Sequence, residues 1–329
     1  MSKTILGSVF GARCCAVVAA IAAACAIAAC SNAPSIAPSE QPLSKDTMMM
    51  LGRKGMDQGA PMFVRIFKEE SELEVWKARD DGRFYHFKTY PICNWSGKVG
   101  PKTAVGDRQA PEGFYRVSEE QMNPNSKFYL AFNLGYPNAY DRSKKRTGQA
   151  LMVHGDCKSA GCYAMTDALM EEIYALAREA FAGGQKTFEV HAFPFRMTRE
   201  NMARHKGHKH YAFWRTMKQG YDFFETYRLT PTVAVCERRY VVNVKLPAGR
   251  SIRADDACPR FQRPIVQPFT PRPYEQQLAS ERITVPGPKM RKVASTQRAK
   301  TGTGSGFAKA FGLGGPVTAE ILSTLGFSQ

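Results

Sequence analysis

Residues 151–167 read LMVHGDCKSAGCYAMTD, a stretch in which an apolar run, a glycine-containing loop and the start of a helix follow one another. Its apolar start predicts a central strand that ends in His154-Gly155, and a tight loop then leads to Gly161-Cys162 just before a helix. A cysteine near a helix N-terminus feels the positive end of the helix dipole, so we expect a lowered thiol pKa. A histidine on the adjoining strand end can take the thiol proton, and Gly161 lets amides approach a developing oxyanion. These are the parts of an acyl-transfer site.

The segments around this stretch predict a β-rich α+β fold. A helix should run from Thr166-Asp167 to the glycine pair at 183–184, because its apolar residues recur at helical spacing. The alternating residues of 63–68, 72–79 and 83–90 predict half-buried antiparallel strands. Further strands are expected at 114–117, 128–134, 186–193 and, as a pair, within 231–246, and a basic helix is expected over 199–218.

The first thirty residues resemble a bacterial lipoprotein signal. Lys3 and Arg13 precede the apolar run of 17–29, which is short and rich in alanine, and small residues then lead to Cys30. We therefore expect cleavage before Cys30 and acylation of that cysteine, which would anchor the protein stably. The signal places the protein in the periplasm, anchored by its lipid. Ser31 after the cysteine favours the outer membrane over the inner one. An ordinary signal cleaved nearby is the alternative.

Composition limits the class of protein. The chain has 329 residues with 43% hydrophobic content, which suffices for one sizeable core and excludes a collagenous, coiled-coil or wholly disordered protein. Lys and Arg number 46 against 29 Asp and Glu, a net charge of +17. Such a surplus favours polyanionic surroundings. Because the signal directs the protein out of the cytoplasm, nucleic acid is not an expected partner.

Five of the nine cysteines remain beyond the signal and Cys30, namely Cys93, Cys157, Cys162, Cys236 and Cys258. In an oxidising compartment an odd number leaves at least one thiol free or paired with another chain. If Cys162 stays free, the other four cysteines could form the disulfides 93–157 and 236–258, but the sequence does not fix which cysteines pair. A regulatory bond between Cys157 and Cys162 is the less favoured alternative.

The motifs together resemble the catalytic domain of the YkuD-type L,D-transpeptidases, in their YafK-like branch. The run GCYAMTD at 161–167, the upstream His154-Gly155, and segments such as 91–93, 109–115, 193–197 and 220–222 carry the likeness, which covers roughly residues 60–245. The resemblance implies a β-rich YkuD-type sandwich with a helix after the catalytic cysteine loop. One residue departs from the family pattern, because Ala160 stands where most members have a second histidine.

Carried over by position, Cys162 matches the nucleophile and His154 the upstream general base. Ser159, Gly161 and Tyr163 match the oxyanion site and its loop. The implied reaction is acyl transfer at meso-diaminopimelate in peptidoglycan stem peptides, through a Cys162 thioester. An amine would resolve the thioester to a cross-link or a protein attachment, and water would resolve it by hydrolysis, as in an amidase that releases a peptidoglycan-linked outer-membrane lipoprotein. No cofactor is implied.

The expected organisation is a signal peptide at 1–29, a flexible tether at 30–58, the catalytic domain at 59–247 and a basic, mostly disordered tail at 248–329. The alternative function is a non-catalytic peptidoglycan-binding scaffold lipoprotein that lost turnover through Ala160. The histidine-rich run of 205–210 is interpreted as a solvated basic surface, since its lysines oppose a metal ion and no carboxylate accompanies it. His191 is expected to be a core or edge histidine.

Overall fold

The computed structural model describes residues 36–245 and 252–271. It is a mixed α+β structure with two five-stranded sheets and one two-stranded ribbon. The first sheet has the order β3-β2-β1-β10-β5 and consists of β1 (Met62–Phe67), β2 (Glu72–Ala78), β3 (Phe84–Pro91), β5 (Gly113–Ser118) and β10 (Thr187–Phe193). The β1 and β10 strands are parallel, and the other neighbours in this sheet are antiparallel. The predicted β-rich α+β class is confirmed.

The second sheet is built around the stretch that carries the cysteine. Its order is β4-β9-β8-β7-β6, and its strands are β4 (Asn94–Trp95), β6 (Met122–Ser126), β7 (Tyr129–Asn133), β8 (Met152–His154) and β9 (Tyr163–Ala164). The β8 and β9 strands are parallel, with Val153 opposite Tyr163. The ribbon pairs β11 (Val233–Cys236) with β12 (Arg239–Val242).

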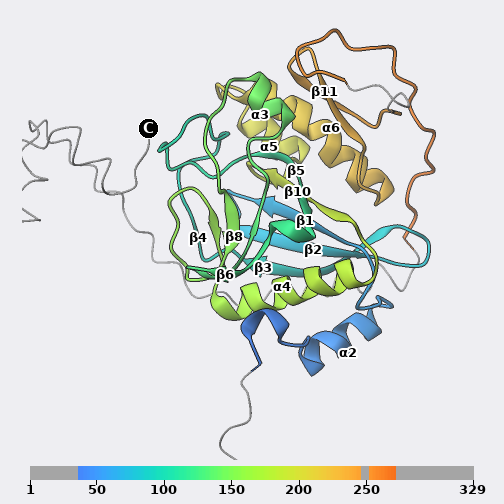
Figure 1. Cartoon of the computed structure of the whole chain (residues 1–329). Helices are drawn as coiled ribbons and strands as arrows, with labels where there is room; N and C mark the ends of the chain where they lie inside the picture. Colours follow the sequence, from blue (N-terminus) through green and yellow to red (C-terminus); the bar gives the residue numbers. More distant parts are fainter. Residues whose placement is uncertain (1–35, 246–251, 272–329) are drawn as a thin grey trace, which may run out of the picture. The chain divides into compact units, whose positions relative to one another are not determined.

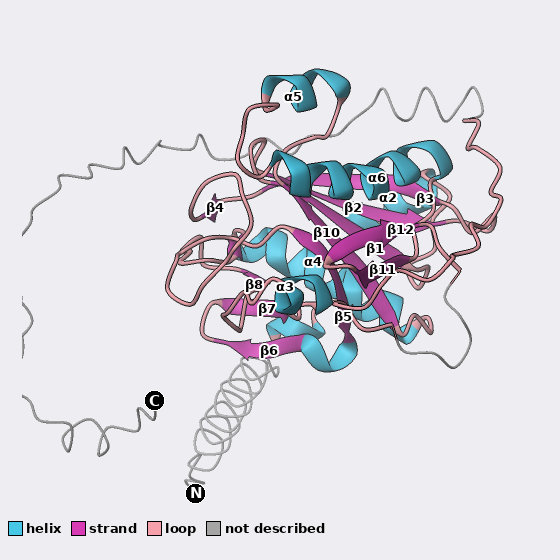
Figure 2. Cartoon of the chain, turned by 90° about the horizontal axis from the view of Figure 1, so that it is seen from above, coloured by secondary structure: helices cyan, strands magenta, loops and turns pink. Residues whose placement is uncertain are grey.

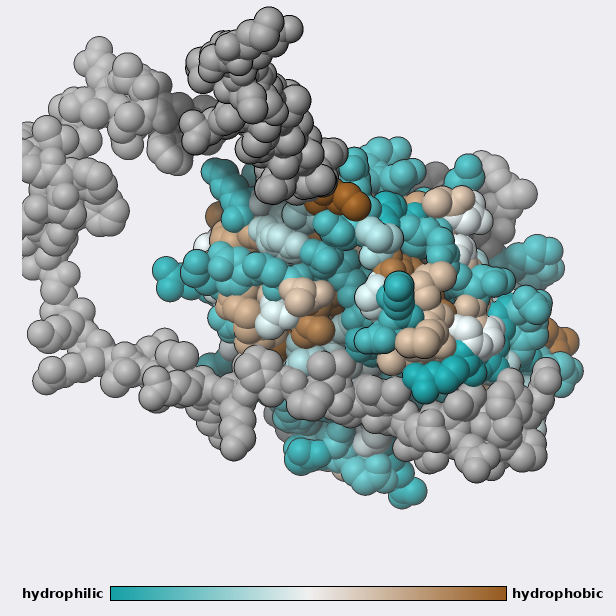
Figure 3. Space-filling model, turned by 90° about the horizontal axis from the view of Figure 1, so that it is seen from below, coloured by the Kyte–Doolittle hydropathy of each residue, from teal (hydrophilic) through white to brown (hydrophobic). Residues whose placement is uncertain are grey.

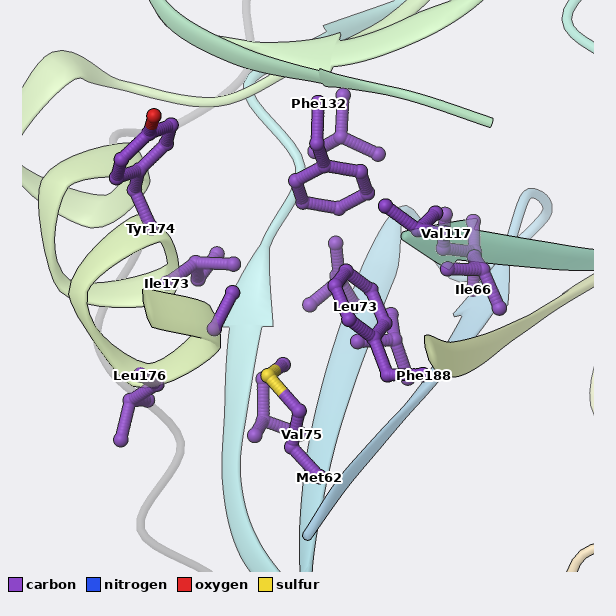
Figure 4. Close-up of a cluster of buried hydrophobic side chains, with 14 of the residues drawn as sticks. Met62, Ile66, Leu73, Val75, Val117, Phe132, Ile173, Tyr174, Leu176 and Phe188 are labelled. Carbon is purple, nitrogen blue, oxygen red and sulfur yellow. The ribbon is translucent and has the colours of Figure 1, made fainter. Parts of the chain in front are cut away.

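The main hydrophobic core lies between the first sheet, the second sheet and helix α4 (Asp167–Ala182). In the close-up of Figure 4, Ile173 of α4, Phe132 of β7 and Leu73 of β2 belong to this one buried cluster. The Thr166 hydroxyl caps α4 by accepting the N–H of Leu169, and Gly184 follows the helix with a φ of 96°. The predicted helix of 166–182 is therefore confirmed at both ends.

The expectation of half-buried strands is wrong for β1, in which all six residues are buried, and for β2, in which all residues but Glu72 are buried. Helix α6 (Tyr211–Tyr227) covers the other face of this sheet, and Figure 1 shows α4 and α6 on opposite sides of it. The Phe224 ring of α6 lies 4.8 Å from Phe63 and 4.9 Å from Trp76. Figure 2 shows the same arrangement from above. Aromatic residues of α6, which is distant in sequence, thus bury the face of β1 that the alternating sequence pattern predicted to be exposed to solvent.

The basic helix expected over 199–218 is two helices. Helix α5 (Arg199–Arg204) ends just before His205, and α6 begins at Tyr211, so the histidine-rich run forms the connection between them. The α6 helix also continues to Tyr227, beyond the expected end. Its buried aromatic residues explain the extension, because packing against the first sheet stabilises a helix more than local propensity does.

Parts of the expected tether and tail have structure. Helix α2 (Lys45–Arg53) lies within 30–58, and its Leu51, 2% exposed, belongs to the main core. A 3-10 helix (Pro38–Glu40) precedes it, and two short elements lie elsewhere, a 3-10 helix (Glu119–Gln121) and α3 (Ala139–Ser143). In the tail, Cys258 is bonded to Cys236, and Glu237 N donates to the Asp256 carbonyl at 2.8 Å. The signal, Cys30 and the tail beyond residue 271 lie outside the described residues.

The described surface carries few large exposed apolar side chains. Figure 3 shows hydrophobic residues in small groups among hydrophilic ones on the face seen from below. Among residues 36–245 and 252–271, no helix is both long enough and apolar enough to cross a bilayer.

Candidate active site

Cys162 and His154 lie at opposite ends of the short parallel pair of β8 and β9, and both line one pocket, which has a volume of about 570 Å³. Cys162 immediately precedes β9, while His154 is the last residue of the parallel strand β8. The Cys162 sulfur accepts the Met152 N–H at 3.4 Å and donates its own hydrogen to the Ala150 carbonyl at 3.8 Å. Pairing of β8 with β9 therefore brings together two residues that the sequence separates by eight positions.

The backbone fixes the tautomer of His154. The side chain is 3% exposed, and its Nδ1 lies 2.6 Å from the Gly155 carbonyl oxygen. Because a carbonyl oxygen can only accept, Nδ1 carries the hydrogen and Nε2 is left as the basic nitrogen. Burial lowers the pKa of His154, and the Gly155 contact partly opposes this effect. The imidazole is therefore neutral and able to accept a proton at neutral pH.

Gly155 allows the close packing around this histidine. A Cβ built at this position would lie 2.5 Å from Asp167 Oδ1 and 3.1 Å from the Phe128 carbonyl oxygen. The adjacent Asp156 N–H donates to the same Asp167 carboxylate at 2.7 Å. A glycine is needed because the start of α4 closes on the loop at this point.

The expected low pKa of Cys162 is wrong. Burial raises the pKa of the thiol, and the Met152 N–H and the Lys102 charge only partly oppose this effect. Helix α4 begins five residues later, after β9, so the sulfur does not lie at the helix N-terminus. The resting pair is a thiol and a neutral imidazole, which requires proton transfer at the moment of attack.

The loop between the two residues is held at several points. A disulfide joins Cys157 to Cys93, with 5.3 Å between the Cα atoms, so Cys162 is the one free thiol among the described residues. The Ser159 hydroxyl donates to the Cys162 carbonyl at 2.7 Å. Gly161 has a φ of 137°, which disfavours any other residue. Ser159 and Gly161 therefore shape the backbone of this loop.

Tyr163 does not belong to the loop or to an oxyanion site through its side chain. The ring is fully buried in the main core, and its hydroxyl donates to the Pro111 carbonyl at 2.5 Å. Residues on a strand alternate between its two faces, so the neighbour of Cys162 points away from the pocket. This assignment is corrected to a core position.

Most residues that line the pocket were not predicted as site residues, among them Lys102, Val105, Phe128 and Lys158. Lys102 Nζ donates to the Asp107 carboxylate and, at 2.8 Å, to the Ala104 carbonyl. The Phe128 ring lies 4.8 Å from the His154 ring and is 42% exposed. Nothing local in the sequence points to Phe128. Ala160 lines the pocket as well, so the place of the missing histidine remains open to a ligand.

His191 has the core position expected from sequence, whereas the histidines of 205–210 are half-buried rather than solvated, and His205 lies 3.2 Å from Glu69. His191 is fully buried, and its Nε2 lies 2.8 Å from Glu189. The run of 205–210 packs beside Trp214, with the His208 ring stacked on it at 4.4 Å. Within the part of the chain that the structure describes, no group of three metal-ligating side chains is close enough to hold an ion.

The comparisons with known proteins agree with this arrangement. Residues 63–190 match the L,D-transpeptidase catalytic domain named YkuD. The chain is 43% identical over 205 residues to "Putative L,D-transpeptidase YafK" of Escherichia coli strain K12, covering 62% of this chain and 80% of that protein. A protein of the same name from strain O157:H7 matches equally well. The fold and site thus define an L,D-transpeptidase catalytic domain, and the chain belongs to the YkuD family.

Two solved structures are more distant. The helical cell shape determining protein Pgp2 from Campylobacter jejuni is 19% identical, with a TM-score of 0.33 over 55% of this chain and 64% of that one. Bd1075 from Bdellovibrio bacteriovorus is 22% identical, with a TM-score of 0.29 over 50% and 60%. This chain spans less than two thirds of each, and at these scores neither likeness bears on its function.

Proposed function

We propose that the protein is a cysteine acyl-transfer enzyme acting on the meso-diaminopimelate stem peptides of peptidoglycan. The observation that carries the proposal is that the free Cys162 thiol and the His154 imidazole line one pocket beside the parallel strands β8 and β9. The hydrogen on Nδ1 of His154 leaves Nε2 free to accept the thiol proton. Membership of the L,D-transpeptidase family supplies the substrate class.

The first half-reaction uses both residues. His154 Nε2 accepts the thiol proton as Cys162 Sγ attacks the carbonyl at the L-centre of diaminopimelate, and a tetrahedral oxyanion forms. Backbone amides around Gly161 and Cys162 stabilise that oxyanion in this proposal. The C–N bond then breaks, the imidazolium returns its proton to the leaving amine, and a thioester remains on Cys162. Because the resting thiol pKa is raised, this base is required.

The second half-reaction decides between transferase and hydrolase. An incoming amine would give a cross-link or a protein attachment, whereas water would give hydrolysis, including release of a peptidoglycan-linked outer-membrane lipoprotein. Purified sacculi treated with the enzyme and resolved by mass would separate these outcomes. New 3–3 cross-links would identify the transpeptidase, and released lipoprotein fragments would identify the amidase.

A carbapenem tests the proposal against the non-catalytic alternative. We expect the wild-type protein to gain the mass of one carbapenem, the Cys162→Ala variant to gain none, and the His154→Gln variant to react at least about 100-fold more slowly. An unreactive wild-type thiol in folded protein would instead favour the peptidoglycan-binding scaffold.

The location is part of the same proposal. Acylation of Cys30 would hold the catalytic domain at the periplasmic face of the outer membrane, within reach of the wall. The mature wild-type protein should then begin at Cys30 and carry the added mass of acyl chains on its first residue. A mature protein that begins elsewhere, or that carries no acyl chain, would contradict this anchor.

A further inference from the structure

A second pocket, lined on one side by α6, carries five cationic side chains and no carboxylate among its lining residues. We call it the basic cleft. Its volume is about 530 Å³, and its cations are Lys144, Arg146, Lys209, Arg238 and Arg239. None of these five residues belongs to the motifs that define the catalytic site.

The charges of the basic cleft are incompletely neutralised. Arg146 is paired with Asp141 at 2.7 Å and Arg239 with Glu237 at 2.8 Å, while Asp255 lies 3.8 Å from Arg238. For Lys144 and Lys209, no carboxylate in the described part of the chain lies within ion-pair distance. Burial lowers the pKa of Lys144, and the neighbouring charges of Arg238 and Arg146 lower it further. Two of the five cations, Lys144 and Lys209, therefore add positive charge to the cleft without a described carboxylate partner.

The chemistry of the lining selects an anion. Lysine and arginine side chains only donate hydrogen bonds, so a neutral sugar would find many donors but no carboxylate to accept its hydroxyl hydrogens. A carboxylate or another anion accepts from several of these groups at once. Behind the cations, the Tyr140 ring stacks on Phe213 at 5.1 Å and on Tyr240 at 4.4 Å, which gives the cleft a rigid wall.

The basic cleft and the catalytic pocket are lined in part by different residues of the same two chain segments. In the first segment, Thr103 lines the cleft, while Lys102 and Val105 line the pocket. In the second segment, Lys144 and Arg146 line the cleft, while residues 148–151 line the pocket. Two hydrogen bonds join these segments, from Thr147 N to the Thr103 carbonyl at 3.1 Å and from Val105 N to the Thr147 hydroxyl at 3.1 Å. A polymeric substrate engaged at Cys162 therefore has a cationic surface beside it.

We propose that the basic cleft binds the carboxylates of a peptidoglycan stem peptide next to the one that reacts at Cys162. The identity of the ligand rests on the proposed function, because that function places the protein on peptidoglycan. Binding of a neighbouring peptide would hold the wall polymer on the enzyme through many weak contacts and raise the effective concentration of the reacting peptide.

The test is sedimentation of the full-length protein with purified sacculi, with the Cys162→Ala substitution present throughout to prevent turnover. The double variant Lys144→Glu/Lys209→Glu reverses two exposed charges that have no described carboxylate partner. We expect its affinity for sacculi to fall about tenfold or more, and to depend less on salt than the wild-type affinity does. A matched control, Arg53→Glu/Lys186→Glu, makes the same charge change at exposed positions outside the cleft and should bind like the wild type.

Two further ligands identify the anion. Sacculi stripped of their stem peptides by an amidase should bind wild type and double variant equally weakly. Vesicles containing phosphatidylglycerol should not distinguish the double variant from its control. Equal binding of both variants to intact sacculi would overturn the proposal, and a defect confined to the vesicles would reassign the cleft to a lipid phosphate. Because binding is measured without turnover, a failure of the Cys162 chemistry would leave this result unaffected.

Discussion

Burial raises the pKa of the Cys162 thiol, and the positive charge of Lys102 partly opposes that rise. Replacing Lys102 with methionine removes the opposing charge, so the thiol pKa should rise further. The pH dependence of alkylation by iodoacetamide measures this effect, and its midpoint should move to higher pH.

Two variants separate the charge of Lys102 from its structural contacts. Lys102→Arg keeps the charge and should leave the alkylation midpoint near the wild-type value. Lys158→Met removes a lysine of the same pocket that is not among the groups shifting the thiol pKa, and should not move the midpoint. An unchanged midpoint in Lys102→Met would contradict the electrostatic role.

Gly161 tests the conformation of the loop at a single residue. Its φ of 137° is unfavourable for alanine, so Gly161→Ala should reduce the free energy of unfolding by about 1–3 kcal/mol and slow carbapenem acylation. Gly52 in α2 has a helical backbone, and no atom lies within 4 Å of the place that an alanine Cβ would take, so Gly52→Ala should instead stabilise the protein by up to about 1 kcal/mol. Urea unfolding of both variants checks the opposite signs, and equal effects would refute the argument.

At the scale of elements, the disulfide between Cys93 and Cys157 ties the catalytic loop to the start of β4. The Cys93→Ser/Cys157→Ser variant should lose about 2–4 kcal/mol of stability and acylate more slowly, because the segment carrying Ser159 is no longer held. Urea unfolding and the rate of carbapenem adduct formation measure the two effects.

The second disulfide is the matched control. The Cys236→Ser/Cys258→Ser variant removes a bond that closes a shorter loop, 22 residues against 64, and lies outside the catalytic pocket. It should lose somewhat less stability and acylate at the wild-type rate under conditions where both variants are folded. Equal slowing in the two variants would mean that reduced stability alone explains the effect.

Elements with strong local signals were predictable from sequence, and those that depend on distant partners were not. The periodic helix of 166–182, with its hydroxyl cap and glycine stop, was predicted at both ends. The burial of β1 was not, because the second covering layer comes from α6, some 150 residues later. Helix α2 was missed because its one core residue, Leu51, is embedded in a methionine-rich segment that resembles a tether.

The candidate site divides in the same way. His154, Cys162, Ser159 and Gly161 were predictable because they occur within one short motif. The raised thiol pKa was not, since it follows from the burial of the sulfur in the folded chain. The core position of Tyr163 was not either, since it follows from the two-residue strand β9 between the cysteine and the helix. Phe128 reaches the pocket only through the pairing of β7 with β8, which leaves no local pattern.

Across the whole molecule, a buried ionic network joins the first sheet to helix α6, which covers one of its faces. Arg65 of β1 contacts Glu74 of β2 at 2.7 Å and Glu225 of α6 at 2.6 Å, and Arg196 also contacts Glu74 at 2.7 Å. Arg65 and Glu74 are almost fully buried, so each depends on the other for compensation. This network is part of the contact between the first sheet and α6. The alternation of residue types in β1 did not predict that contact.

Replacing Glu74 with glutamine tests this network through its pH dependence. Burial acts to raise the pKa of Glu74, but the charges of Arg65 and Arg196 outweigh it and hold the pKa well below its usual range. The unfolded chain therefore binds this proton at a higher pH than the folded one. The stabilisation is complete above about pH 4.5, the usual glutamate value, and is lost progressively as the pH falls below it.

At pH 7, the Glu74→Gln substitution should reduce the free energy of unfolding by about 3–5 kcal/mol, because the buried Arg65 loses the negative charge of one of its two carboxylate partners. Between pH 5 and pH 3 the wild type should lose stability more steeply than the variant, so the difference between them should narrow. Glu119→Gln, at an exposed carboxylate, is the control and should track the wild type throughout. Urea unfolding at a series of pH values measures all three proteins, and a wild-type–variant difference that stays constant down to pH 3 would show that Glu74 is not held ionised by the two arginines.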